Sequence, residues 1–124
     1  EINNFKISLP IISKYNSMEF YKYSFNQPLK LNKYGIPEPN KLNKILPDIL
    51  LVPLVAFDKN LFRIGYGAGY YDRYITKLEK KKSFITIGLA FSFQLVKKVP
   101  VNKFDKKLDF IITENKVYKW NCYF

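Results

Sequence analysis

The chain has 124 residues, 48% hydrophobic and 18% aromatic, and no run near the roughly 18 apolar residues of a membrane helix, so we expect one soluble globular domain over residues 1–124. The sequence contains no histidine, which excludes Ser-His-Asp triads, Cys-His pairs and ordinary zinc hydrolase sites. Its net charge of +11 favours polyanionic partners, although coding bias toward lysine would produce the same charge.

Two short runs near the N-terminus predict strands. Residues 5–12 (FKISLPII) and 17–24 (SMEFYKYS) are rich in β-branched and aromatic residues with partial alternation. Residues 25–47 hold four prolines and a glycine, so we expect a long ordered loop there rather than a helix. Loops of this length in compact domains are often functional.

The middle of the chain predicts a buried strand and then a helix. Residues 47–58 (PDILLVPLVAFD) are nearly continuously apolar, as in a strand of a parallel sheet that is covered on both faces. Pro53 marks the end of that strand or an edge. Further on, a helix that ends at the lysine run 80–82 has one apolar face, formed by Tyr71, Tyr74, Ile75 and Leu78.

The C-terminal third predicts the remaining strands of the sheet. Residues 83–91 (SFITIGLAF) and 108–113 (LDFIIT) read as buried strands, with one or two helical turns over 92–99 and a possible edge strand in 117–120. This order of strands and helices is typical of an α/β fold. We therefore expect a three-layer, open and mostly parallel sheet with helices on its faces.

The stretch RIGYGAGYYDRY, from Arg63 to Tyr74, indicates a ligand-binding loop. It lies between a buried strand and a helix start, where open α/β sheets place their ligand sites. Gly65, Gly67 and Gly69 permit positive φ angles, so successive N–H groups can form an anion site near the positive end of the helix. The alternative is a glycine-rich turn with Asp72 as helix N-cap. The GxGxG spacing supports neither a Rossmann coenzyme domain nor a P-loop.

Charged residues around the loop strengthen the ligand interpretation. Arg63 and Arg73 flank it with guanidinium groups that suit phosphate or carboxylate, unless they are ordinary surface arginines. Asp72, Asp105 and Asp109 stand in cationic sequence. Magnesium held by one or two carboxylates and a substrate phosphate would account for them, and so would helix caps or surface ion pairs.

Cysteine usage and the first residues favour the cytoplasm. Cys122 is the only cysteine, so we expect neither an internal disulfide nor redox chemistry. The opening EINNFKISLPII has no signal-peptide pattern, so nothing in it argues for export.

Four segments, in this order, resemble the 5-formyltetrahydrofolate cyclo-ligase (methenyltetrahydrofolate synthetase) family: PDILLVPLVAFD, RIGYGAGYYDRY, IGLAFSFQ and VPVNKFDKKLDFIITE. KISLPII, MEFYKYS and KYGIPEP also correspond to the middle section of the family, so the match covers residues 5 to about 118. The RxGxGxGYYD element is highly specific in this context.

The resemblance implies ATP- and Mg²⁺-dependent closure of 5-formyltetrahydrofolate to 5,10-methenyltetrahydrofolate, with release of ADP and phosphate. In that scheme ATP phosphorylates the formyl oxygen, the N10 atom of the folate attacks the activated carbon, and phosphate departs. The protein supplies positioning and charge stabilisation but no nucleophile, which a chain without histidine can do.

The resemblance also implies roles for single residues. Arg63, Tyr70 and Asp72 would be catalytic, and Asp72 and Asp109 would hold magnesium. Tyr34 would hold the pterin together with the loop from Tyr66 to Tyr70. Gln94 and Asp105 match motif positions without an assigned role. The ATP-phosphate loop would comprise Arg63, Ile64, Gly65, Tyr66, Gly67, Ala68, Gly69, Tyr70 and Tyr71, and its substrate-contacting part Tyr66, Gly67, Ala68, Gly69 and Tyr70.

The family normally has a further N-terminal segment whose Lys and Arg clamp ATP and whose Glu binds the folate, and this segment is absent before Glu1. We therefore expect an exposed apolar sheet surface, and either a monomer or a complementing N-terminal fragment as partner. Two alternatives remain at this point. One is a non-catalytic relic or partial subunit that at most binds nucleotide weakly. The other is a basic nucleic-acid-binding domain, which no recognised motif supports, so we expect neither nucleic acid nor membrane as partner.

Overall fold

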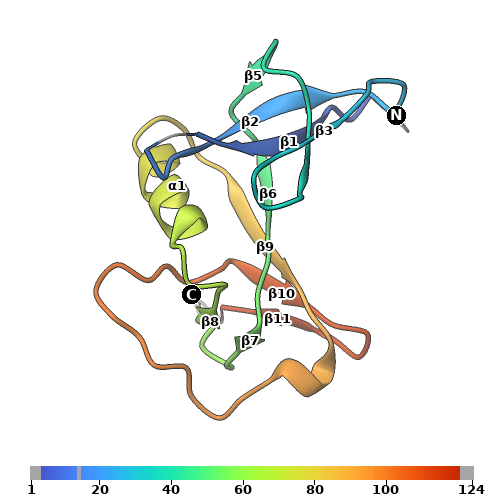
Figure 1. The fold of residues 1–124 in the computed structure, drawn as a ribbon. Helices are drawn as coiled ribbons and strands as arrows, with labels where there is room; N and C mark the ends of the chain where they lie inside the picture. Colours follow the sequence, from blue (N-terminus) through green and yellow to red (C-terminus); the bar gives the residue numbers. More distant parts are fainter. Residues whose placement is uncertain (1–3, 14, 121–124) are drawn as a thin grey trace. The chain divides into compact units, whose positions relative to one another are not determined.

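The computed structural model describes residues 4–13 and 15–120 (Figure 1). Cys122 lies outside the described residues. The chain divides into two compact units, Glu1–Pro47 and Asp48–Phe124, and each is described by itself. The expectation of one domain over residues 1–124 stays a prediction.

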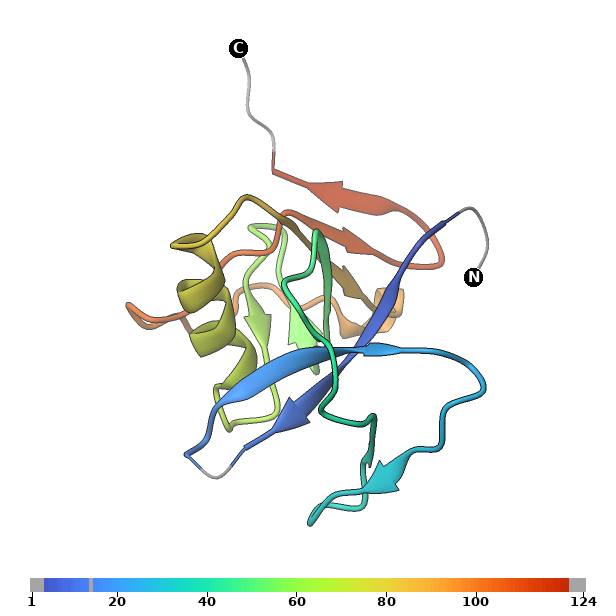
Figure 2. The same cartoon turned by 90° about the horizontal axis from the view of Figure 1, so that it is seen from above.

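The first unit contains an antiparallel sheet of order β1-β2-β5 (Figures 1 and 2). β1 (Ile7–Ile12) pairs along its whole length with β2 (Met18–Tyr23), and β5 (Lys44–Ile45) pairs with β2 on the other side. Both strands predicted near the N-terminus are therefore confirmed. Met18 and Phe20 are each 5% exposed, because alternate residues of a strand point to the same face and this face of β2 is buried.

The predicted loop over 25–47 contains β5 and a further small strand pair rather than a helix. β3 (Lys30–Leu31) and β4 (Pro37–Glu38) pair in antiparallel fashion. The Glu38 carboxylate accepts hydrogen bonds from Ile12 N at 3.0 Å and from Asn32 Nδ2 at 3.2 Å. One carboxylate thus ties the loop to β1 and orders it.

The second unit contains a four-stranded mixed sheet of order β11-β10-β9-β6. The bounds of its strands are as follows: β6 Ile49–Val52, β9 Ile85–Leu89, β10 Phe110–Ile112 and β11 Val117–Lys119. β6 and β10 run parallel to β9, and β11 lies antiparallel at the edge. The predicted strands and the edge strand are confirmed, and β6 ends directly before Pro53, as expected for a residue that cannot donate to the ladder.

One face of this sheet is buried and the other is open. Leu50, Val52 and Ile111 are at most 2% exposed, whereas Ile49 and Leu51, their neighbours along β6, are 51% and 55% exposed. The open face also carries Ile85, Leu89, Ile112 and Val117, all exposed apolar residues. The prediction that residues 47–58 form a strand covered on both faces is therefore wrong for this chain. Apolar residues on both sides of a strand do not reveal whether a second layer is present. The expected exposed apolar sheet surface is observed.

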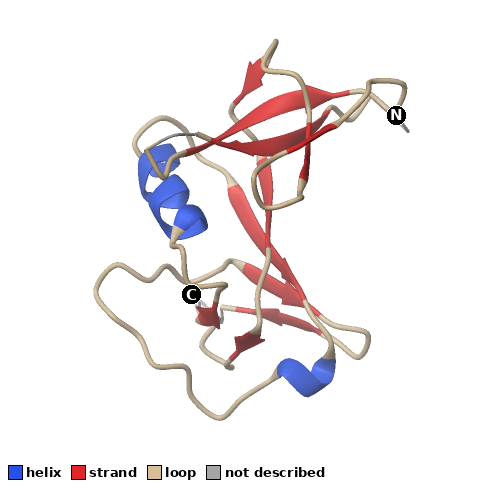
Figure 3. Cartoon of the chain, viewed as in Figure 1, coloured by secondary structure: helices blue, strands red, loops and turns tan. Residues whose placement is uncertain are grey.

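The described part of the chain contains one α-helix, α1 (Tyr70–Glu79), and one 3₁₀ turn, η1 (Ser92–Gln94) (Figure 3). The helix after the glycine loop and a single turn within 92–99 are thus confirmed. Helix and mixed sheet together confirm the α/β class. The three-layer arrangement is not confirmed, since this one helix cannot cover both faces of the sheet.

Candidate functional site

A short hairpin positions Arg63 at the start of the glycine loop. β7 (Ala56–Phe57) pairs in antiparallel fashion with β8 (Arg63–Ile64), so that Arg63 lies opposite Phe57. The turn between them is built around the carboxylate of Asp58, which is 2% exposed.

The Asp58 carboxylate accepts three backbone hydrogen bonds. Oδ1 accepts from Asn60 N at 2.9 Å and from Phe62 N at 3.2 Å, and Oδ2 accepts from Val99 N at 2.9 Å. A buried carboxylate is stable when its oxygens are satisfied in this way. Sequence reasoning missed Asp58, because an aspartate after an apolar run is equally typical of an exposed turn.

Arg63 is held on two sides by protein oxygens. Its Nη1 donates to Pro53 O at 3.3 Å, and its Nη2 lies 3.3 Å from Asp72 Oδ1. The Arg63 side chain is 6% exposed, and its buried Nε has no hydrogen-bond partner among the described residues. The loop therefore begins with a nearly buried cation that retains an unused donor.

The three alternating glycines differ in their surroundings and backbone conformation. A Cβ on Gly65 would lie 2.5 Å from Arg63 Nη1, and a Cβ on Gly69 would lie 2.8 Å from Arg73 Nη1. Gly67 has open space around it but a φ of +95°. Gly65 and Gly69 thus make room for guanidinium groups of the chain itself, and Gly67 permits a backbone conformation that other residues disfavour.

The helix begins directly after the loop. Its N-cap is Gly69, in the left-handed conformation with φ +71°, so the alternative of Asp72 as N-cap is wrong. Asp72 lies in the first turn, where a carboxylate is favoured by the helix dipole. Arg73 Nη1 donates to Ala68 O at 2.8 Å, and its guanidinium lies over the Tyr70 ring at 5.2 Å. Arg73 therefore closes the loop onto the helix.

The aromatic residues of the loop differ in exposure. Tyr66 is 77% exposed and Ile64 is 40% exposed, so both are accessible to a ligand. Tyr71 is half-buried, and burial raises the pKa of its phenol above the ordinary 10.0, while the Arg63 guanidinium acts in the opposite direction. The Tyr71 hydroxyl therefore carries its proton at neutral pH.

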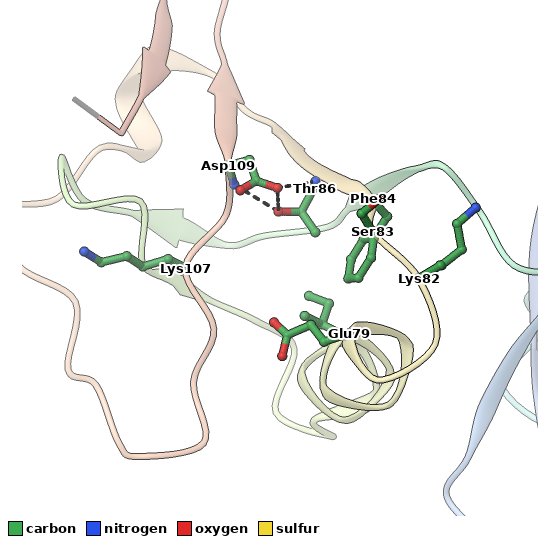
Figure 4. Close-up of a pocket in the computed structure, with 8 residues that line it drawn as sticks. Glu79, Lys82, Ser83, Phe84, Thr86, Lys107 and Asp109 are labelled. Atoms are coloured by element: carbon green, nitrogen blue, oxygen red, sulfur yellow. Dashed lines mark hydrogen bonds between the residues drawn. The ribbon is translucent and has the colours of Figure 1, made fainter. Parts of the chain in front are cut away.

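Asp109 belongs to a different group. Its Oδ2 accepts from Thr86 N at 2.8 Å and from Thr86 Oγ1 at 3.1 Å, and its own N donates to Thr86 Oγ1 at 2.9 Å (Figure 4). Thr86 is level with Leu50 on β6. Arg63, which pairs with Asp72, contacts Pro53. Pro53 lies three residues after Leu50, a separation of about 10 Å along a strand. The structure thus holds the two predicted magnesium carboxylates in separate groups.

A cavity of about 290 Å³ lies beside Asp109 and is lined by Ile75, Glu79, Lys82, Ser83, Phe84, Thr86, Lys107 and Asp109. Lys82 and Lys107 extend in opposite directions, away from Thr86 (Figure 4). Glu79 pairs with Lys106 at 3.2 Å, and Lys82 pairs with Asp48. Glu79, Lys82 and Asp109 are thus engaged with polar groups of the chain, and the Lys107 ammonium lies over the Trp120 ring.

Tyr34, the residue expected to hold the pterin, lies in the first unit. It is 58% exposed and lines a cavity of about 230 Å³ together with Ile12, Ser13, Asn32 and Lys33. Its backbone N donates to Asn32 Oδ1 at 2.8 Å, and the Lys33 ammonium lies 5.1 Å from its ring centroid. The ring is therefore accessible for stacking.

The two motif residues without a role also have clear positions. Asp105 Oδ2 accepts from Asn102 N at 2.9 Å and closes a turn in an exposed segment. Gln94 lies at the end of η1, and its side chain bonds Phe91 N, Leu54 O and Val55 O. Both side chains thus form hydrogen bonds with backbone groups of the chain.

The residues around Arg63 fit a phosphate group better than an isolated metal ion. A buried guanidinium, a glycine loop and the start of a helix provide positive potential and donors. Asp72 is a suitable magnesium ligand beside a bound phosphate, because Mg²⁺ commonly takes one or two carboxylates and completes its shell with phosphates and water. Among residues 4–13 and 15–120, no group of three His, Cys, Asp or Glu side chains could hold a metal alone.

Within the described part of the chain, no helix is long and apolar enough to cross a membrane. Residues 3–114 match the model of the 5-formyltetrahydrofolate cyclo-ligase family. The chain is 40% identical over 115 residues to a 5-formyltetrahydrofolate cyclo-ligase of Haemophilus influenzae, covering 86% of this chain and 60% of that protein. It is 34% identical over 122 residues to the Escherichia coli cyclo-ligase, covering 93% and 66%.

Two solved structures are similar as well. The NMR structure of Aquifex aeolicus 5,10-methenyltetrahydrofolate synthetase matches with a TM-score of 0.75 and 32% identity, covering 92% of this chain and 58% of that one. A 5,10-methenyltetrahydrofolate synthetase from Mycoplasma pneumoniae matches with a TM-score of 0.67 and 29% identity, covering 90% and 57%. The chain therefore spans roughly three fifths of the length of these relatives.

Proposed function

The chain belongs to the 5-formyltetrahydrofolate cyclo-ligase family, and we propose that it takes part in the ATP- and magnesium-dependent conversion of 5-formyltetrahydrofolate to 5,10-methenyltetrahydrofolate, with release of ADP and phosphate. The observation that carries this proposal is the pairing of Arg63 with Asp72 across a glycine loop at the start of α1. In this arrangement a cation for phosphate and a carboxylate for magnesium lie side by side.

The loop from Arg63 to Tyr71 would bind the phosphates of ATP. Gly67 keeps a backbone conformation with positive φ, and its surroundings are open. The dipole of α1 favours an anion at this end of the helix. Arg63 would turn its guanidinium from Asp72 toward the phosphate, where its fork geometry favours the charge that develops on transfer.

Asp72 would hold magnesium together with the phosphates. When bound, Mg·ATP supplies the phosphoryl group that activates the formyl oxygen. The side chains named here supply no nucleophile. Their task is to orient the reactants and to stabilise charge, and a chain without histidine can do both. Asp109 stays a predicted second ligand, and it would have to leave Thr86 to join Asp72.

Reduced folate is the proposed substrate. Tyr66 and Tyr70 extend the loop with aromatic surface, and the exposed ring of Tyr34 would stack on the pterin. The proposed location is the cytoplasm. We propose that the chain is either a monomer or the partner of a complementing N-terminal fragment.

The test is the rise in absorbance on formation of methenyltetrahydrofolate, after the chain is mixed with 5-formyltetrahydrofolate and Mg·ATP. Turnover that is lost in Asp72→Ala would support the proposal. A folded chain that binds ATP without turnover would instead favour the alternative, a non-catalytic relic or partial subunit. A folded chain that binds neither ATP nor folate would overturn the proposal.

A further inference from the structure

The side chain of Gln94 joins the 3₁₀ turn to the segment that follows β6. Its Oε1 accepts from Phe91 N at 2.7 Å, which closes η1. Its Nε2 donates to Val55 O at 3.0 Å and, less ideally, to Leu54 O at 3.4 Å. The amide of one side chain thus satisfies three backbone groups from two segments that are about forty residues apart in sequence.

The segment held by Gln94 is the one that supports Arg63. Val55 N donates to Ile64 O at 2.7 Å, so Val55 is bonded to Gln94 by its carbonyl and to β8 by its amide. Two residues before Val55, the carbonyl of Pro53 accepts from Arg63 Nη1. A displacement of residues 53–55 would therefore move both the backbone of β8 and the acceptor of the guanidinium.

A neighbouring contact extends the same attachment. Val96 N donates to Phe57 O at 2.8 Å, and Phe57 lies opposite Arg63 in the hairpin. Residues 94–96 thus run along one edge of the segment 54–57, while β8 occupies the other edge. Gln94 is the first residue of this contact, and its hydrogen bonds to residues 54–55 are made by its side chain.

From this geometry we propose that Gln94 is a positioning residue of the glycine loop: it fixes residues 54–55, and through them Arg63 and the loop, without touching the ligand. The proposal rests on the proposed function for its nucleotide readout only. The role is specific, because it requires the two donor hydrogens of the amide, whereas closure of η1 requires only the oxygen.

The chain offers matched variants to test this role. Gln94→Met keeps the length of the side chain and removes all three bonds. Gln94→Glu keeps the acceptor for Phe91 N and removes the donors to Leu54 and Val55. Ser92→Ala is the control, because the Ser92 hydroxyl bonds Glu114 Oε2 at 3.2 Å and so ties the same turn to a different segment.

Two measurements are made on the full chain. Amide hydrogen exchange is followed at Val55, whose N–H pairs with Ile64, and at residues 63–67. Affinity for Mg·ATP and, where turnover is present, the KM for ATP and kcat are measured alongside. We expect exchange at least tenfold faster and ATP binding about tenfold weaker in both Gln94 variants. The kcat at saturating ATP should fall as well, because Arg63 would stabilise the charge that develops on transfer. Ser92→Ala should behave like the unchanged chain.

The two measurements, hydrogen exchange and ATP affinity, test this inference and the proposed function separately. If Gln94→Met is folded but has unchanged exchange at Val55, or if Ser92→Ala has the same effect as Gln94→Met, the positioning role is wrong. If the unchanged chain does not bind ATP, the proposed function fails, and the exchange arm still decides the role of Gln94. If a variant fails to fold, the other Gln94 variant provides the comparison.

Discussion

The Nη2 atom of Arg63 lies 3.3 Å from Oδ1 of Asp72, so the cation that would meet phosphate is neutralised by the carboxylate that would meet magnesium. Each group is held in place by the other while no ligand is bound. A magnesium–nucleotide complex would offer a partner of opposite charge to both, which makes the binding of cation and anion at this position mutually dependent.

Asp72→Asn should uncouple nucleotide binding from magnesium. The variant leaves Arg63 without its counter-charge, so ATP in excess chelator should bind severalfold more tightly than to the unchanged chain, and added magnesium should no longer increase the affinity. Methenyltetrahydrofolate formation should fall at least about 100-fold, which is typical of the loss of an electrostatic contact to the transition state. Titration of a fluorescent ATP analogue, with and without magnesium, measures the first effect.

Asp109→Asn is the comparison for that experiment. Because Asp109 bonds Thr86 and not Arg63, its variant should keep the magnesium enhancement of nucleotide binding. A loss of that enhancement in Asp109→Asn would show that Asp109 moves to the ion, as the family resemblance implies.

Gly67→Val should abolish nucleotide binding and leave the strands intact. Position 67 has a φ of +95°, which a β-branched residue adopts only with strain of about 1–3 kcal/mol, so the loop would change its path. Gly35→Val is a matched control, since Gly35 also has open space and a positive φ of +74° but lies in the first unit. Circular dichroism reports the fold, and normal ATP affinity in a folded Gly67→Val variant would refute the loop assignment.

Asp58→Asn should destabilise the chain without any ligand present. The amide can accept at one atom only, so its NH₂ would face the N–H of Val99, which now bonds Asp58 Oδ2. One buried donor left unsatisfied costs about 1–3 kcal/mol. Urea denaturation should show a loss of this size. For Asp105→Asn, which changes an acceptor in an exposed turn, we expect less than about 1 kcal/mol; equal losses would argue against the central role of Asp58.

Tyr71→Phe should change how stability depends on alkaline pH. Burial raises the pKa of the Tyr71 phenol in the folded chain, so the unfolded chain loses this proton first, at about pH 10. The resulting stabilisation is fully present below that pH and is lost as the pH rises toward the folded-state pKa. Urea titrations between pH 8 and pH 11 should show a steeper decline for the unchanged chain than for Tyr71→Phe; parallel declines would contradict the raised pKa.

Local patterns predicted most of the secondary structure. β-branched runs located β1 and β2, the i, i+3, i+4, i+7 spacing located α1, and Pro53 located the end of β6. These signals succeed because backbone conformation depends mainly on neighbours in sequence. The same reasoning failed for the open face of β6, because whether Ile49 and Leu51 are covered depends on what packs there, and their identity alone does not determine that.

The candidate site was predicted in the same uneven way. Glycine spacing and flanking charges identified the loop, since a positive φ at Gly67 and charged forks at Arg63 and Arg73 are properties of single residues. The contacts of Asp58 with Val99 and of Gln94 with Val55 span about forty residues. No local pattern specifies such contacts, so their roles emerged only from the fold.

Gly65 and Arg63 are coupled through the space that they share. The place where a methyl group of residue 65 would stand lies 2.5 Å from Arg63 Nη1, the atom that donates to Pro53 O, so even alanine would require the guanidinium to shift. A substitution at position 65 therefore acts first on the arginine two residues earlier. The effects of changes at positions 63 and 65 should not be additive, because a shorter side chain at position 63 would leave room for one at position 65.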